Sequence, residues 1–118
     1  MKLTVGKVFE IEDDFQNVFF AKSGIHVRPK YKELKLSSRT INEIHYEDLY
    51  IIEPKKYYYI EFNEDRESYV SMLQEEIFNE CGLITMFSTA NRLYLYNATM
   101  NIQYIQKGME VGEAYGNG

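Results

Sequence analysis

Short runs of aromatic and β-branched residues, separated by turn residues roughly every eight to twelve positions, constrain the fold of this chain most. The clearest run is Tyr-Tyr-Tyr-Ile-Glu-Phe at residues 57–62, which follows the turn-like Pro54-Lys55-Lys56. Such residues favour strands because they pack well on a pleated, half-buried surface. Many short strands with frequent turns predict a mostly-β domain, either a barrel or a sandwich. A length of 118 residues suits a single domain.

The C-terminal third of the chain shows strand-like alternation. Leu93, Leu95 and Asn97 alternate with Tyr94 and Tyr96, so we expect these two sets to lie on opposite faces of one strand. Further strands are expected in residues 2–11 (broken at Gly6), 17–28 (turning at Ser23-Gly24), 83–89 and 102–106.

The stretch LQEEIFNECGLI has the apolar spacing of a short helix. Leu73, Ile77 and Cys81 recur at helical intervals, and Gly82 is a suitable C-terminal cap. This pattern predicts a helix near residues 74–81, with Cys81 on its apolar, core-facing side.

The segment KLSSRTINEIHYEDLYIIEP fits two interpretations. Ile41, Ile44 and Leu49 could share one face of a second short helix that begins at Ser37 or Ser38. The β-branched and tyrosine content around residues 48–54 favours a strand instead.

Three consecutive tyrosines would place rings on both faces of one strand. Either both faces are buried, or one face presents Tyr57 and Tyr59 to a partner. Lys55 and Lys56 precede them, but acidic residues follow, so we expect an interface with a protein more than one with nucleic acid.

The overall charge narrows the classes of partner. The formal net charge is −5, which argues against a general nucleic-acid binder because such proteins need basic surfaces. The single cysteine, Cys81, excludes an internal disulfide and suggests a reducing compartment. No run reaches the ~18 apolar residues of a membrane span, and the N-terminus does not resemble a signal peptide. We therefore expect a cytoplasmic location.

No motif indicates a metal or a cofactor. The only histidines are His26 and His45, and one cysteine without paired spacing does not complete a zinc site. The chain contains no phosphate-binding glycine loop. We expect no cofactor, except that Mg²⁺ would accompany a nucleotide if one is bound.

The C-terminal half resembles the dUTPase and dCTP deaminase superfamily. The resemblance covers about residues 50–113 and is carried by strand, turn and glycine spacing: a strand ending at Asn97, a second strand at residues 102–105, and Lys-Gly-Met-Glu-Val-Gly at residues 107–112. It implies a dUTPase-like barrel or sandwich and a homotrimer. Gly82, Gly108 and Gly112 would occupy turns.

The same resemblance places residues 70–73 on a strand, with Phe78 as the core contact of the helix. The helical spacing also extends back to Tyr69 and Val70, so the two interpretations disagree about where the helix begins.

The sequence departs from the family where its chemistry lies. The phosphate-binding Arg-Ser-Ser run falls on Glu75, Glu76 and Ile77, and two carboxylates would repel a triphosphate. The segment 85–96 has no Asp or Glu to activate water. We therefore expect no catalytic residues.

These observations predict a small non-enzymatic binding protein on a degenerate dUTPase-like scaffold. Its composition suggests a phage or mobile element, where it would act as an inhibitor or decoy by binding a host or phage protein or a small nucleotide. Two alternatives stay open: an active nucleotide pyrophosphatase or deaminase, and a phage structural subunit. The residues expected to contact a ligand or partner are Glu75, Glu76, Asn79, Tyr57, Tyr59, Lys55 and Lys56.

Overall fold

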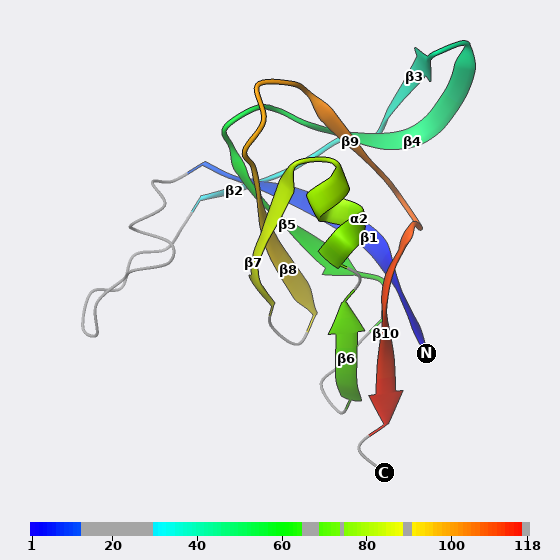
Figure 1. Ribbon diagram of the computed structural model, residues 1–118, viewed down its shortest axis with the longest axis vertical. Helices are drawn as coiled ribbons and strands as arrows, with labels where there is room; N and C mark the ends of the chain where they lie inside the picture. Colours follow the sequence, from blue (N-terminus) through cyan, green and yellow to red (C-terminus); the bar gives the residue numbers. More distant parts are fainter. Residues whose placement is uncertain (13–29, 65–68, 74, 89–90, 117–118) are drawn as a thin grey trace, which may run out of the picture.

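A computed structural model describes residues 1–12, 30–64, 69–73, 75–88 and 91–116. The described residues form strands and one short helix (Figure 1). In chain order the elements are β1 (Lys2–Ile11), β2 (Tyr31–Glu33), β3 (Ser37–Ile41), β4 (Ile44–Ile52), β5 (Tyr57–Phe62), β6 (Tyr69–Leu73), α2 (Glu75–Glu80), β7 (Leu83–Ser88), β8 (Arg92–Asn97), β9 (Gln103–Gln106) and β10 (Glu110–Gly116). The prediction of a mostly-β protein is confirmed. The strand pair expected in residues 17–28 lies outside the described residues.

The strands form two antiparallel sheets. The larger sheet has the order β6-β10-β1-β5-β8-β7, with β2 also paired to β1, and the smaller has the order β3-β4-β9. The end strands β6 and β7 do not pair with each other, so the expectation of a barrel is wrong. One edge of β1 is divided between two partners, because Lys2–Thr4 pair with β10 and Phe9–Ile11 pair with β2.

The main core lies between the two sheets. Tyr50 and Ile52 of β4 and Ile105 of β9 pack against the inner face of the larger sheet, and Phe78 of α2 completes the core. Leu93, Leu95 and Asn97 are buried, while Tyr94 packs in a separate cluster on the other face, as the alternation predicted. The other core residues are Leu3, Val5, Val8, Tyr58, Ile60, Phe62, Leu83 and Val111.

The expected break at Gly6 is a bulge within one continuous strand. The register between β1 and β5 shifts between Val5 and Lys7. A Cβ atom at Gly6 would lie 2.8 Å from the carbonyl oxygen of Glu61, so only glycine fits this close approach without a shift. The Tyr50 hydroxyl donates a 2.7 Å hydrogen bond to the Gly6 carbonyl and joins the two sheets at this point.

The ambiguous segment at residues 35–54 forms strands β3 and β4 and contains no helix. Asn42 and Glu43 connect β3 to β4 with φ values of 51° and 68°. Two positive φ values identify a type I′ hairpin turn, whose twist matches that of the flanking strands. The strand preference of the β-branched and tyrosine residues decided the local structure here.

The helix expected near residues 74–81 is confirmed as α2. Residues 69–73 are strand, so the helical spacing that extends back to Tyr69 and Val70 does not correspond to helix there. Phe78 is the buried helix residue, whereas Cys81 is exposed and the prediction that it faces the core is wrong. The helix ends before Cys81, so helical spacing no longer sets the direction of that side chain.

Two of the three expected turn glycines lie in turns. Gly82 and Gly108 have φ values of 74° and 82°, which favour glycine. Gly112 lies within β10, where it pairs with Leu3 on one side and Leu73 on the other, so the prediction of a turn at Gly112 is wrong. In β10 the residue is buried in the sheet.

Candidate functional site

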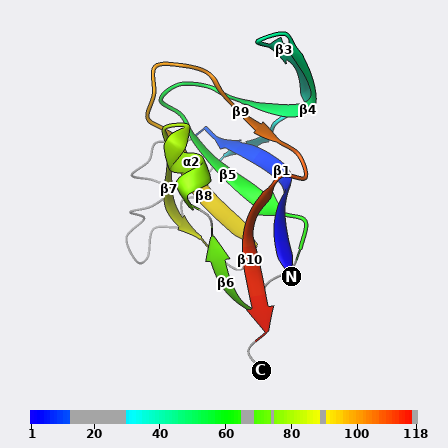
Figure 2. The same ribbon diagram turned by 45° about the vertical axis from the view of Figure 1, so that its right-hand side comes forward.

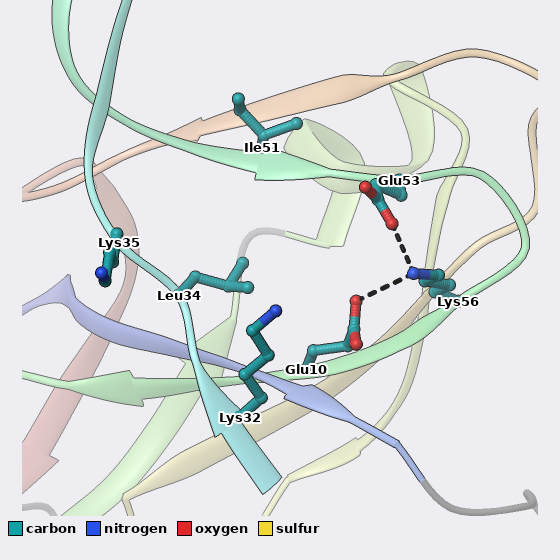
Figure 3. A pocket seen from close by; sticks show the side chains of 7 residues that line it. All are labelled: Glu10, Lys32, Leu34, Lys35, Ile51, Glu53 and Lys56. Carbon is teal, nitrogen blue, oxygen red and sulfur yellow. Dashed lines mark hydrogen bonds and ion pairs between the residues drawn. The ribbon is translucent and has the colours of Figure 1, made fainter.

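A charged cavity of about 250 Å³ lies at one end of the core, where β1, β2, β4 and the start of β5 come together (Figure 3). We call it the lysine cavity because three lysines contribute to its wall. The lining residues are Glu10, Lys32, Leu34, Lys35, Ile51, Glu53 and Lys56.

Strand pairing places the first two charged residues of the cavity. Glu10 and Lys32 are direct partners in the antiparallel β1–β2 pair, so their side chains share one face. Glu10 is also two residues beyond Val8, a core residue of the same strand. It therefore lies at the end of the core, and only 15% of its side chain is exposed. The strand pair continues through a 2.9 Å hydrogen bond from Leu34 N to the Val8 carbonyl, which fixes Leu34 at the wall.

A tight turn places Glu53 and Lys56. Glu53 N donates a 2.8 Å hydrogen bond to the buried Tyr58 hydroxyl. Lys55, with φ 59°, donates from its backbone N to the Asn97 carbonyl, and Asn97 N donates to the Lys56 carbonyl. The turn is therefore held on both sides by buried residues.

Lys56 bridges two carboxylates. Its Nζ donates to Glu53 and, at 3.3 Å, to Glu10 (Figure 3). The hydrogen bond with Glu53, and then that with Glu10, raises the pKa of Lys56 well above its usual value, while burial acts in the opposite direction. Lys56 is therefore held as a cation, and it pairs with both carboxylates.

Lys32 and Lys35 give the cavity its free positive charge. Within the described ranges, neither lysine forms an ion pair. In Figure 3 the Lys32 ammonium points into the space between Leu34 and Glu10. Three lysines against two glutamates leave one net positive charge around the cavity. This arrangement suits an anionic group at Lys32, with Leu34 and Ile51 beside it for apolar contact and a second positive charge, Lys35, on the other side of Leu34 (Figure 3).

Tyr57 and Tyr59 lie on the opposite face of the larger sheet from the main core. The Tyr57 ring stacks on Tyr96 with centroids 4.4 Å apart, and the Tyr59 ring stacks on Phe9 at 4.7 Å. Only 2% of Tyr59 is exposed. Its ring is therefore packed inside an aromatic cluster and has almost no exposed surface.

The Arg92 guanidinium covers part of this cluster. It lies 4.5 Å from the centroid of the Tyr59 ring and 5.8 Å from that of Tyr31. Its hydrogen bond with the Tyr94 hydroxyl is the largest cause raising the pKa of Arg92. Burial raises the pKa of Tyr59 to about 12.

The structure separates the remaining site residues expected from the sequence. Glu76 and Asn79 are exposed on α2 and do not line the lysine cavity. Glu75 begins α2, but its side chain lies outside what the structure describes. Lys55 Nζ donates a 2.6 Å hydrogen bond to the Ala98 carbonyl, which supports the turn. Among the expected residues whose side chains the structure describes, Lys56 alone lines the lysine cavity.

Sequence reasoning missed the other residues of the lysine cavity. Glu10 had a usable signal, because it shares the alternation of Val8 and so occupies a core-facing position with a charge. No local sequence pattern marks Lys32, Lys35 or Glu53 as part of the cavity. The pairing of β1 with β2 and the approach of β4 bring together residues that are distant in the sequence.

The described ranges contain no group of three His, Cys, Asp or Glu side chains that could hold a metal ion. Nor does any helix in the described part of the chain have the length and apolar character needed to cross a membrane. Comparison with known proteins gives no match to a family model and none to a curated protein.

Proposed function

We propose that this protein is a non-catalytic binding protein whose ligand is a small phosphate-bearing molecule of the mononucleotide class. The observation that carries the proposal is the pair of lysines without ion-pair partners in the described chain, Lys32 and Lys35, on the wall of the lysine cavity. A phosphate placed there would form charge-assisted hydrogen bonds, which are stronger than neutral ones.

The other residues of the wall suit the remainder of a nucleotide. Leu34 and Ile51 offer apolar contact to a planar base. The outer lone pairs of Glu10 and Glu53 can accept hydrogen bonds from sugar hydroxyls or from base amino groups. Ligand cavities commonly combine apolar walls with a few polar groups in this way.

The size of the cavity limits the ligand. Its volume of about 250 Å³ is just under the roughly 300–1,000 Å³ usual for small-molecule sites. A monophosphate fits this volume better than a triphosphate. A triphosphate would also bring more negative charge than one net positive charge can balance.

The dUTPase-like scaffold remains part of the proposal. The order of elements supports it: strand β6, helix α2 ending before Gly82, strands β7 and β8 ending at Asn97, then β9 and the turn at Gly108. The open larger sheet is a departure from that scaffold. The cavity that carries the proposed function does not depend on this relationship.

Isothermal titration with nucleoside 5′-monophosphates tests the proposal. We expect saturable binding that falls roughly tenfold or more in Lys32→Gln and in Lys35→Gln, because each loses a charged donor. Lys107→Gln is the matched control, since Lys107 is exposed and does not line the lysine cavity. It should bind like the unaltered protein.

Two results would contradict the proposal. No binding of any monophosphate, or binding that both lysine variants retain in full, would remove the lysine cavity as the site. Turnover of a bound deoxynucleotide in the presence of Mg²⁺ would contradict the non-catalytic assignment and favour a pyrophosphatase or deaminase.

A further inference from the structure

Strands β3 and β4 extend beyond the rest of the smaller sheet as a two-stranded arm, residues 37–48. Strand β9 pairs with β4 only over Leu49–Ile52, so the earlier part of β4 pairs with β3 alone. Figures 1 and 2 show the arm projecting away from the larger sheet. An isolated two-stranded hairpin is marginal in water, so an arm of this kind gains stability when one of its faces is covered.

One face of the arm is apolar. Ile41 and Ile44 are direct cross-strand partners, and Tyr46 is two residues from Ile44, so the three side chains share a face. Ile44 is 56% exposed. The opposite face is polar, because the Thr40 hydroxyl and the His45 ring form a 3.2 Å hydrogen bond there.

The apolar face leads into a second cavity at the base of the arm. Its volume is about 240 Å³, and it is mostly apolar; the lining residues are Ile41, Tyr46, Leu49, Tyr104, Gln106 and Met109. An apolar cavity of about 150 Å³ already accommodates benzene, so this one has room for an aliphatic side chain. The exposed Ile44 and the cavity thus lie on the same side of the arm, a few residues apart.

Two charged residues of the arm indicate that the occupant of this cavity is a second copy of this chain. Arg39 is the cross-strand partner of Tyr46, so it shares the apolar face and lies beside the cavity. Glu43 immediately precedes Ile44 at the tip. Across the ranges that the structure covers, neither Arg39 nor Glu43 has an ion-pair partner. A tip carrying Ile44 into the cavity of another copy would bring Glu43 close to Arg39 of that copy.

We propose that two copies of the protein associate through their arms about a two-fold axis, in place of the homotrimer that the resemblance implies. Ile44 of each copy fills the apolar cavity of the other, and Glu43 of each copy pairs with Arg39 of the other. Because the tip and the cavity occupy one face of one arm, a two-fold arrangement makes both contacts at once, as a self-complementary interface requires. The lysine cavity shares no residue with this interface.

Sedimentation equilibrium of the purified full chain over a wide concentration range tests the interface. The unaltered protein should form a dimer. Ile44→Lys should weaken dimerisation by at least about 100-fold, because two buried apolar side chains become charged. Ile84→Lys is the matched control: Ile84 is 49% exposed, but it lies on β7, and its replacement should leave dimerisation unchanged.

Exchanging the charges of Arg39 and Glu43 distinguishes the loss of an interface contact from a general effect on folding. Arg39→Glu and Glu43→Arg should each weaken the dimer roughly tenfold, because either substitution removes both symmetry-related Glu43–Arg39 ion pairs. The double variant R39E/E43R should restore it, because the pair is rebuilt with reversed charges. Circular dichroism should show all variants folded. A monomer at every concentration, an assembly with another number of copies, or single variants that the double variant does not rescue would overturn the proposal.

Discussion

The side-chain amide of Asn97 donates a 3.0 Å hydrogen bond to the carbonyl oxygen of Ile52, which ties the end of β8 to the end of β4. Asn97 is fully buried and also donates to the Asn101 carbonyl, while its Oδ1 accepts from the backbone N and the hydroxyl of Thr99. One buried amide therefore joins the two sheets and shapes the loop that leads to β9.

Asn97→Ala should destabilise the protein by about 2–4 kcal/mol, because several buried partners lose their hydrogen bonds at once. Urea denaturation measures the change as a lower midpoint with an unchanged slope. Asn91→Ala is the control: Asn91 is exposed, and its replacement should stay within about 0.5 kcal/mol. Equal effects of the two substitutions would show that the Asn97 network contributes little.

Gly82→Ala should be more costly than Gly108→Ala. Both glycines have positive φ, which costs a non-glycine residue about 1–3 kcal/mol. At Gly82 the added Cβ would also lie 2.2 Å from the Thr99 Cγ2 methyl, whereas no atom lies within 4 Å at Gly108.

The double variant G82A/T99S isolates the steric part of that cost. Serine lacks the methyl group but keeps the hydroxyl that bonds to Asn97. We expect the double variant to recover the excess cost of Gly82→Ala, as measured by thermal unfolding. No recovery would mean that the Thr99 methyl moves aside and that backbone strain alone sets the cost.

The protein should lose stability between about pH 10 and pH 12. Burial raises the pKa of Tyr58 and of Tyr59 from 10.0 to about 12. A group whose pKa is higher in the folded state stabilises the protein fully below the unfolded pKa and loses that contribution as the pH rises through the folded pKa. For Tyr59 alone the loss is on the order of 2 kcal/mol.

Denaturation at several alkaline pH values, with phenolate absorbance as the second readout, measures this loss. Tyr59→Phe should show a smaller decline over the same range, because phenylalanine does not titrate. If Tyr59→Phe declines as steeply as the unaltered protein, deprotonation of Tyr59 is not what destabilises the folded state.

Arg92→Lys should destabilise the protein by about 0.5–1 kcal/mol, and Arg92→Ala by more. The guanidinium lies over the Tyr59 ring and donates a hydrogen bond to the Tyr94 hydroxyl, and an ammonium cannot make both contacts as well. Chemical denaturation gives the values. Lys2→Ala, where 72% of the side chain is exposed, should change stability little and serves as the control.

The local sequence was sufficient to predict the elements that depend only on interactions between residues close together in the chain. The Tyr57–Phe62 strand, the short helix at Glu75–Glu80 and the turn glycines Gly82 and Gly108 follow from side-chain shape, apolar spacing and backbone conformation over a few residues. The opposite faces of residues 93–97 also follow, because alternation is a property of any strand.

Tertiary structure alone decided the rest. Whether the larger sheet closes depends on whether its end strands β6 and β7 pair, and no local pattern specifies that, nor the division of β1 between β10 and β2. The lysine cavity depends on the same pairing, since Glu10 and Lys32 are 22 positions apart in the printed sequence and meet only as cross-strand partners. Local preferences determine which residues form strands, but the long-range pairing of those strands determines which side chains meet.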